Sequence, residues 1–337
     1  MNKKRIGKRT IRLNNMPTII AASSIVGPKE GQGPLKDKFD LILSDDLYGE
    51  KTWELAESKM MQTVMEMTVQ KANKKLDDIN FAFGGDLINQ IFPASFAARE
   101  LGIPFFGIYG ACSTMTEGMC LGSMAIDGEY ADYVLCGTSS HYSTAERQFR
   151  FPLELGNQKP MTAQWTVTGS GSVLLAKEGQ GPKIKYIIPG KVIDKGIDDG
   201  NNMGAAMAPA AIDTIYSYFQ DTKDDPNSFD MIATGDLGKV GKEILISILK
   251  ENDLDISKVY TDCGLEIFDL EEQDVHCGGS GCGCSATVFC SYIYDKLIKK
   301  EFNKVMLIST GALLSPTSTL QKQTIPSVAH GVVIVNE

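Results

Sequence analysis

The fold is decided by the stretch IPFFGIYGACST at residues 103–114, together with DYVLCGTSS at residues 132–140. The first part is a short apolar run rich in aromatic residues and bounded by Pro104 and Gly110, which is typical of a buried strand. The second stretch is again apolar and predicts another strand. With a helix between them they form a β-α-β unit, whose two strands are expected to run parallel.

A central, buried helix is predicted between these two strands. Ser113 and Thr114 can cap its N-terminus, and methionines then recur near helical spacing. Gly118 and Gly122 follow, four residues apart. Because glycine lowers helix stability, close backbone packing is its usual compensation. The glycine pair therefore indicates a helix packed tightly inside the molecule.

Cys112 occupies the turn from the first strand into this helix. A sulfur there faces unpaired backbone N–H groups and the positive end of the helix dipole, which lower a thiol pKa and favour a nucleophilic thiolate. Alternatively, Cys112 is one small buried apolar residue among eight cysteines. Its position alone does not separate these interpretations.

The overall composition indicates a globular chain that does not bind nucleic acid. Its 337 residues suffice for two core-forming units, and the net charge of -9 leaves no basic excess to neutralise phosphates. No apolar run approaches the roughly 20 residues of a membrane span, and no apolar segment of a secretory signal follows the basic start. With eight cysteines and no such signal, we expect reduced thiols and a soluble, cytoplasmic-type chain.

Two polar segments are expected to be irregular. Residues 1–16 carry a run of lysines and arginines, which predicts a solvated tail or, alternatively, a weak contact with anionic lipid. The segment 141–160 is polar and contains two prolines, so we expect a loop there.

The chain reads as two similar halves, an N-terminal one at 1–178 and a C-terminal one at 179–337. Gly-Asp-Leu closes a strand and opens a helix at 85–87 and again at 235–237. The order of strands and helices repeats around these points, although few letters match. We therefore predict an α/β fold of duplicated halves, an α-β-α-β-α layered sandwich with pseudo-twofold symmetry and two buried central helices.

A duplicated half with a cysteine opening its central helix resembles the thiolase superfamily. In thiolases and β-ketoacyl synthases this cysteine is acylated, and here it matches Cys112. His276 and the glycines after it resemble the thiolase loop that brings a histidine to the cysteine. Condensing synthases carry a second histidine after the strand that here ends at 234–237, where this chain has none. The resemblance implies a retained cleft, whereas the missing histidine argues against condensation.

Longer strings resemble the stage V sporulation protein AD family of spore-forming bacteria. They are GPKE at 27–30, GACST at 110–114, SSHYSTAERQFR at 139–150 and WTVTG at 165–169. This resemblance implies binding of dipicolinic acid, with or without calcium, in the thiolase cleft. It implies a role in uptake into the developing spore and in release at germination. It also implies membrane-protein partners that hold the chain at the spore inner membrane, and thiolases are commonly homodimers.

The candidate ligand-binding residues gather around the expected cleft. They are Cys112, Ser113, His141, Arg147 and His276. His141 follows a strand at the end where α/β sites lie, although it could be a structural histidine. Arg147 and Arg150 could pair with a dicarboxylate, or could be exposed loop arginines. If the chain is instead an acyltransferase or condensing enzyme, Cys112 is the nucleophile and His276 the base. A third alternative is a structural subunit with a vestigial cleft.

No metal site is expected. The run from His276 to Cys284 offers thiols and an imidazole, but its spacing matches none of the usual zinc pairs and favours a glycine-rich turn into a packed helix. Asp86 and Asp236 stand at equivalent points of the two halves. Helix capping explains both, although a carboxylate there could touch calcium.

Overall fold

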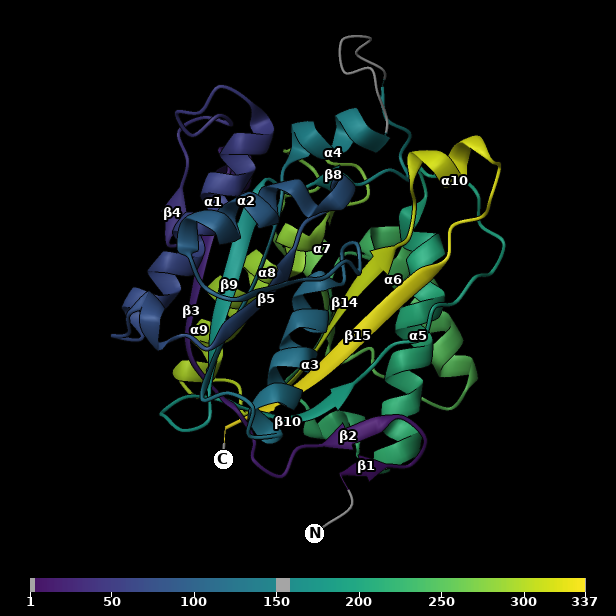
Figure 1. Ribbon diagram of the computed structural model, residues 1–337. Coiled ribbons are helices and arrows are strands. Elements are labelled where there is room, and N and C mark those ends of the chain that lie inside the picture. The colour runs from purple at the N-terminus through teal and green to yellow at the C-terminus, as the bar shows by residue number, and fades with distance from the viewer. Residues whose placement is uncertain (1–3, 150–157, 337) are drawn as a thin grey trace.

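The computed structural model describes residues 4–149 and 158–336 (Figure 1). In the first half, the strands lie in the order β6 (Phe105–Gly107), β5 (Phe81–Gly85), β7 (Tyr133–Ser140), β9 (Gly169–Ala176) and β3 (Thr18–Val26). In the second half, the order is β12 (Tyr260–Asp262), β11 (Met231–Thr234), β14 (Lys304–Ala312), β15 (Ser327–Val335) and β10 (Lys183–Ile188). Both halves therefore arrange these strands as third, second, fourth, fifth and first in chain order. The predicted duplication is confirmed.

The two halves join through their first strands. Thr18 of β3 pairs with Lys183 of β10 in antiparallel register. In each half the fifth strand runs antiparallel to the fourth, β9 against β7 and β15 against β14. The strands around the Cys112 turn do run parallel, but β6 and β7 are not neighbours, because each pairs with β5 between them.

Helices form the outer and central layers of the sandwich. The outer helices are α1 (Trp53–Lys71) and α2 (Phe92–Leu101) on the first half, and α5 (Met203–Thr222) and α6 (Gly238–Glu251) on the second. Figure 1 shows these pairs on opposite sides of the molecule. The central helices are α3 (Thr114–Asp127) and α8 (Cys282–Val288), which contact each other and strands of both halves. α8 continues through a π-helical turn, η6 (Phe289–Ile293), into α9 (Tyr294–Ile298).

The central helix α3 is as tightly packed as its glycines predicted. A Cβ atom added at Gly122 would lie 3.0 Å from both Cys136 Sγ and a Leu175 methyl carbon. A side chain there would push against the side chains of the neighbouring strands β7 and β9. The absence of a side chain at Gly122 therefore lets α3 approach the first sheet closely.

The N-terminal segment is ordered, so the expectation of a loose tail is wrong for its described residues. It forms a hairpin of β1 (Arg5–Ile6) and β2 (Thr10–Arg12), and β2 pairs with β10. The carboxylate of Asp221 accepts hydrogen bonds from three successive N–H groups of this hairpin, those of Lys8, Arg9 and Thr10. Asp221 lies far along the sequence, which is why local composition did not reveal the hairpin.

The expected loop at 141–160 is also partly wrong. Its first part is a helix, α4 (Tyr142–Phe149), in which the Thr144 hydroxyl bonds to the carbonyl oxygen of His141. Arg150 lies outside the described residues. Two short strands, β8 (Trp165–Thr166) and β13 (Gly279–Ser280), pair in parallel and bring the two halves together beside α4.

Candidate functional site

A small cavity of about 40 Å³ lies beside Cys112, where elements of both halves meet. Its walls are formed by Leu87, Tyr109, Ala111, Cys112, Ala145, Glu146, Phe149, Thr166, Met203, Ser280, Ala312 and Leu314. Helix α4 supplies Ala145, Glu146 and Phe149 of this set. The cavity is therefore mostly apolar, with a thiol, hydroxyls and one carboxylate placed around it.

The turn that carries Cys112 is held in an unusual backbone conformation. Ala111 has a φ of 50°, in the left-handed region that residues with a side chain rarely adopt. A Cβ atom at Gly311 on β14 would lie 2.1 Å from the carbonyl oxygen of Gly110, so the two backbones touch. Packing from the second half thus fixes the turn, as is common where backbone strain accompanies a functional site.

The thiol of Cys112 faces a buried carboxylate. Its Sγ lies 4.0 Å from Ser280 Oγ, and Ser280 Oγ donates to Asp236 Oδ2 at 2.9 Å. Burial raises the pKa of the Cys112 thiol well above its usual value, and the charge of Asp236 raises it further. The expectation of a lowered thiol pKa is therefore wrong, because burial and a nearby anion outweigh the helix N-terminus.

Asp236 is held in place by donors from several elements. Its Oδ1 accepts from Thr310 Oγ1 at 2.6 Å, and its Oδ2 accepts from the Gly281 N–H at 3.0 Å as well as from Ser280. Burial raises the pKa of Asp236, while these hydrogen bonds lower it. Asp236 comes two residues after β11, where condensing synthases carry their second histidine. Here an acid, rather than an imidazole, faces the cysteine.

His276 does not reach this cavity. It is not among the described residues that line it, and its Nδ1 lies 3.7 Å from Asp274 Oδ1. Ser280, four residues further on, contacts Cys112 instead. Sequence reasoning missed Ser280 and the role of Asp236. The available signal was that both lie directly beside glycines, Asp236 between β11 and α6 and Ser280 just before α8.

His141 is buried and has both ring nitrogens engaged within the protein. Its Nδ1 accepts from the Ser143 N–H at 3.1 Å, so the proton belongs on Nε2, which donates to the Asp46 carbonyl oxygen at 2.8 Å. Burial lowers the pKa of His141 and favours this neutral form. His141 thus lies immediately before α4 and outside the lining of the Cys112 cavity.

Ser113 and Arg147 also lie outside that lining. The Ser113 hydroxyl is buried and donates to the Gly110 carbonyl oxygen at 2.7 Å, which stabilises the Cys112 turn. Arg147 is half-exposed on α4, pairs with Glu54 of α1, and lies 5.6 Å from the Trp53 ring centroid. Of the five candidate residues, Cys112 alone lines the cavity.

An aromatic and cationic cluster adjoins the cavity. Tyr142 and Trp165 stack with their ring centroids 3.9 Å apart. Lys29 Nζ lies 4.1 Å from the Trp165 centroid, and Lys159 Nζ lies 4.6 Å from the Tyr142 centroid. Lys159 also pairs with Glu146 of the cavity wall at 2.8 Å. The Lys159 ammonium therefore lies next to Glu146 of the cavity wall and is paired with it.

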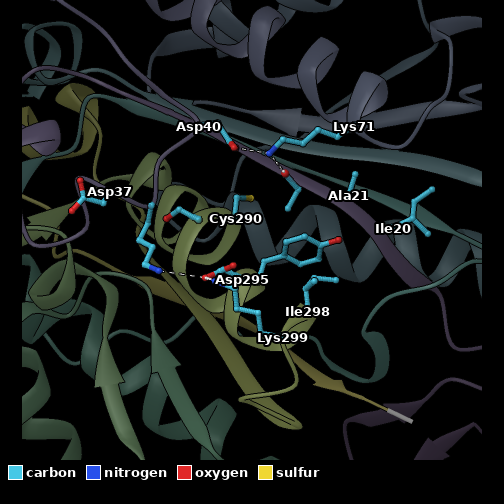
Figure 2. A pocket seen from close by; sticks show the side chains of 13 residues that line it. Ile20, Ala21, Asp37, Asp40, Lys71, Cys290, Asp295, Ile298 and Lys299 are labelled. Atoms are coloured by element: carbon cyan, nitrogen blue, oxygen red, sulfur yellow. Dashed lines mark hydrogen bonds and ion pairs between the residues drawn. The ribbon is translucent and has the colours of Figure 1, made fainter.

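A larger hollow of about 530 Å³ lies elsewhere, between β3 and α9 (Figure 2). Figure 2 shows Lys71 reaching toward Asp40, and these groups form an ion pair at 2.7 Å. Lys299 pairs with Asp295 in the same way at 2.8 Å. The Cys112 cavity remains the better candidate site despite its size, because residues of both halves line it and it contains the Cys112 thiol.

All eight cysteines are buried and free. Within the described ranges, no three His, Cys, Asp or Glu side chains are arranged to hold a metal ion. Cys282 and Cys284 are completely buried at the start of α8, where they pack as small apolar residues.

Comparison with known proteins shows the family. The family model described as stage V sporulation protein AD matches residues 7–335. The chain belongs to the stage V sporulation protein AD family. It is 45% identical over 330 residues to stage V sporulation protein AD of Bacillus subtilis (strain 168), a match that covers 98% of this chain and 97% of that protein.

Solved structures confirm the thiolase-like fold. A variant of OleA from Xanthomonas campestris superposes with a TM-score of 0.62 at 14% identity, covering 96% of this chain and 100% of that one. The 3-oxoacyl-[acyl-carrier-protein] synthase III from Aquifex aeolicus superposes with a TM-score of 0.57 at 10% identity, covering 95% and 100% of the two chains. At these identities the likeness concerns the fold alone.

No helix in the described parts of the chain is both long and apolar enough to cross a membrane.

Proposed function

We propose that this family member binds dipicolinic acid, free or as its calcium chelate, in the Cys112 cavity without turning it over. The supporting observation is that the thiol faces Asp236 and Ser280, and no imidazole lines its cavity among the described residues. Acyl transfer needs a thiolate, and a buried carboxylate beside the thiol opposes its formation. In this proposal the fold keeps its cleft, but the Cys112 thiol does not readily become the thiolate that a nucleophile requires.

The walls of the cavity suit an aromatic acid. Tyr109 and Phe149 offer ring faces, and the Lys159 ammonium stands behind Glu146, within reach of a ligand carboxylate that competes for it. A volume of about 40 Å³ holds only a few water molecules. Binding of a pyridine dicarboxylate therefore requires one wall to move.

Calorimetric titration with dipicolinate, with and without calcium, tests this proposal. Ala312→Val adds two methyl groups to the cavity from β14, where valine suits a strand. Lys299→Ala is the matched control in the larger hollow. We expect Ala312→Val to weaken binding at least about tenfold and Lys299→Ala to leave it unchanged. The reverse pattern, or no binding by the wild type, would sink the proposal.

A second candidate function is acyl transfer, favoured by the strained turn that presents Cys112 at the start of α3. Incubation with a coenzyme A thioester, followed by intact-protein mass measurement, distinguishes it. A mass gain that disappears in Cys112→Ser would establish a nucleophile and contradict a binding role alone. We expect no gain in the wild type.

The biological role proposed for this binding is transport. The protein would take part in uptake of dipicolinate into the developing spore and in its release at germination. Membrane proteins of the same sporulation complex would hold it at the spore inner membrane. Fractionation of sporulating cells should then place the protein with membranes only while these partners are present.

A homodimer is also proposed, formed through the edge strand β6. Phe106 on β6 is 54% exposed, although it stacks on Phe83 with the ring centroids 5.2 Å apart. An open strand edge beside aromatic side chains is a surface that pairs readily with a second copy.

A further inference from the structure

The first strands of the two halves, β3 and β10, correspond to each other residue by residue. Each has a β-bulge at its third residue, since the pairing of β3 with β9 skips Ile20 and the pairing of β10 with β15 skips Lys185. The strands begin at Thr18 and Lys183, which pair with each other where the two halves meet. Counted from these residues, each position of β10 has a counterpart on β3.

The hairpin of β1 and β2 covers β10 on the side that faces away from β15. Ile11 of β2 pairs with Ile187, and the Leu13 N–H donates to the Lys185 carbonyl oxygen at 3.0 Å. Because this pairing is short, side chains of neighbouring helices complete the attachment. Asp127, the last residue of α3, accepts from two N–H groups that follow the hairpin. A short strand therefore docks on β10 with the help of a helix end.

The corresponding side of β3 is open. β10 pairs with β3 only at Thr18, and β4 (Leu41–Ile42) pairs only with the last two residues of β3. In the part of the chain that the structure describes, no strand lies along residues 20–24 on this side. The stretch of β10 that β2 covers thus has an uncovered counterpart on β3.

Two charged side chains stand where a strand would lie. Lys71 Nζ donates to the Ala22 carbonyl oxygen at 2.9 Å, and Asp40 Oδ2 accepts from the Ser24 N–H at 2.9 Å. Ala22, the counterpart of Ile187, therefore points its backbone polar groups away from β9, as Ile187 does toward β2. A lysine at an open strand edge discourages uncontrolled pairing, so this edge is one that the fold protects.

This side of β3 forms one wall of the hollow of about 530 Å³ (Figure 2). Ile20 of β3 lines the hollow together with Tyr294 and Ile298 of α9, and Ile298 is 47% exposed. The charged residues that line it are Asp37, Lys38, Asp40, Lys71, Asp295 and Lys299. An extended segment in the hollow would run along the β3 backbone, with apolar side chains against Ile20 and Ile298 and charged ones at its ends.

The helix ends beside the two strands carry opposite charges. The hairpin on β10 is basic, and carboxylates receive it, Asp221 in the last turn of α5 and Asp127 at the end of α3. Beside β3, α1 ends at Lys71 and α9 is followed by Lys299. Lys299 shares the Asp295 carboxylate with a second lysine. The site on β3 therefore suits a strand with acidic ends.

We propose that the open side of β3 docks an extended acidic segment of a partner protein, which adds an antiparallel strand to the first sheet as β2 does to the second. An N–H of this segment replaces Lys71 at the Ala22 carbonyl oxygen, and an acidic side chain of the segment then pairs with the freed ammonium. None of the residues that line this hollow lines the Cys112 cavity, so the docking site is independent of dipicolinate binding.

A labelled synthetic peptide tests the proposal on the full chain. The probe is Glu-Thr-Val-Thr-Ile-Thr-Glu with blocked ends, whose alternating β-branched residues suit a strand. Fluorescence anisotropy should show saturable binding at least about tenfold tighter than that of the same peptide with lysines in place of both glutamates. N-methylation of its central threonine removes an N–H from the strand and should weaken binding. Hydrogen exchange should show added protection over β3 and none over β10.

Lys299→Glu locates the site without disturbing the core, because Lys299 is half-exposed. This variant should bind the acidic peptide about tenfold more weakly and the lysine peptide more tightly. Lys250→Glu, at an exposed lysine in the last turn of α6, is the matched control and should leave both affinities unchanged. Dipicolinate binding should be the same in both variants, so either proposal can fail while the other stands.

Three results would overturn the docking site. Absence of peptide binding would leave Lys71 and Asp40 as guards of a closed edge. Equal binding of the two peptides, or an acidic-peptide affinity that Lys299→Glu does not change, would reject the acidic partner. Protection over β3 that rises with protein concentration, without peptide, would identify a second copy of this chain as the occupant and reject a separate partner.

Discussion

Asp86 and Asp236 hold equivalent positions in the two halves, yet their surroundings differ. Asp86 bonds to backbone N–H groups of its own half, at Ile88 and Ala94. Asp236 instead bonds to Ser280 and Thr310 and raises the pKa of Cys112, which belongs to the other half. The aspartate of the same Gly-Asp-Leu motif therefore has two roles. Asp86 stabilises the backbone of its own half, whereas Asp236 changes the pKa of the thiol at the candidate site.

The edge strands of the two halves also differ, in how far their aromatic side chains are exposed. A substitution on the exposed edge strand should have the largest effect of those predicted here, on the affinity of the proposed dimer. Tyr260 on the edge strand β12 is buried, whereas Phe106 on β6 is 54% exposed. Phe106→Glu places like charges face to face in the proposed dimer and should weaken it at least about 100-fold. Light scattering across a concentration series measures the change. Tyr130→Glu, at a residue that is 82% exposed, is the control and should leave the mass unchanged.

Two further buried acids, Glu30 and Asp262, differ in how many hydrogen-bond donors their carboxyl groups have. Glu30 of the first half accepts from the Thr168 N–H, while its Oε2 has no partner, and burial raises its pKa to about 8. Asp262 of the second half accepts from the Leu237, Gly238 and Gly264 N–H groups and from Thr234. Burial also raises the pKa of Asp262, but only to about 6, because these donors lower it. We therefore expect Glu30 to keep its proton in the folded state up to a higher pH than Asp262 does.

The pH dependence of stability tests that difference. Between its ordinary pKa of 4.5 and about 8, Glu30 binds a proton in the folded protein that the unfolded chain has released. The contribution of Glu30 to the free energy of unfolding is therefore fully present below about pH 4.5 and is lost as the pH rises through 8. Urea unfolding should show a loss on the order of 3 kcal/mol between pH 5 and 9.

Glu30→Gln should make this profile flatter, because the amide does not titrate. Asp262→Asn is the counterpart from the second half. It removes an acceptor from several donors and should cost about 1–3 kcal/mol at neutral pH. Because the pKa of Asp262 is raised only to about 6, the slope above that pH should stay as in the wild type. Equal slopes in the wild type and Glu30→Gln would show that Glu30 is ionised in the folded protein.

These differences mark the limit of what the sequence reveals. The duplication was readable, because Gly-Asp-Leu recurs at the ends of matching strands. The Cys112 turn was readable, because an apolar run ends at a glycine before capping residues. The sequence did not reveal which residue faces Cys112. Gly278 and Gly281, with φ of 112° and 101°, change the direction of the loop. As a result Ser280 reaches the thiol, whereas His276 does not. The α4 helix was missed because its sequence is polar, and contacts with α1 hold it in place.

The smallest expected effect concerns the reactivity of Cys112. Asp236→Asn removes the nearby negative charge, so the pKa of the Cys112 thiol should fall and its alkylation by iodoacetamide at pH 8 should become about tenfold faster. Peptide mass analysis follows the modification of Cys112 itself. Asp86→Asn, the equivalent change in the first half, is the matched control and should alter the rate much less. If both variants accelerate alkylation equally, cavity opening rather than local charge limits the thiol. If neither does, burial alone suppresses Cys112, and Asp236 would then be, like Asp86, an anchor of its own half.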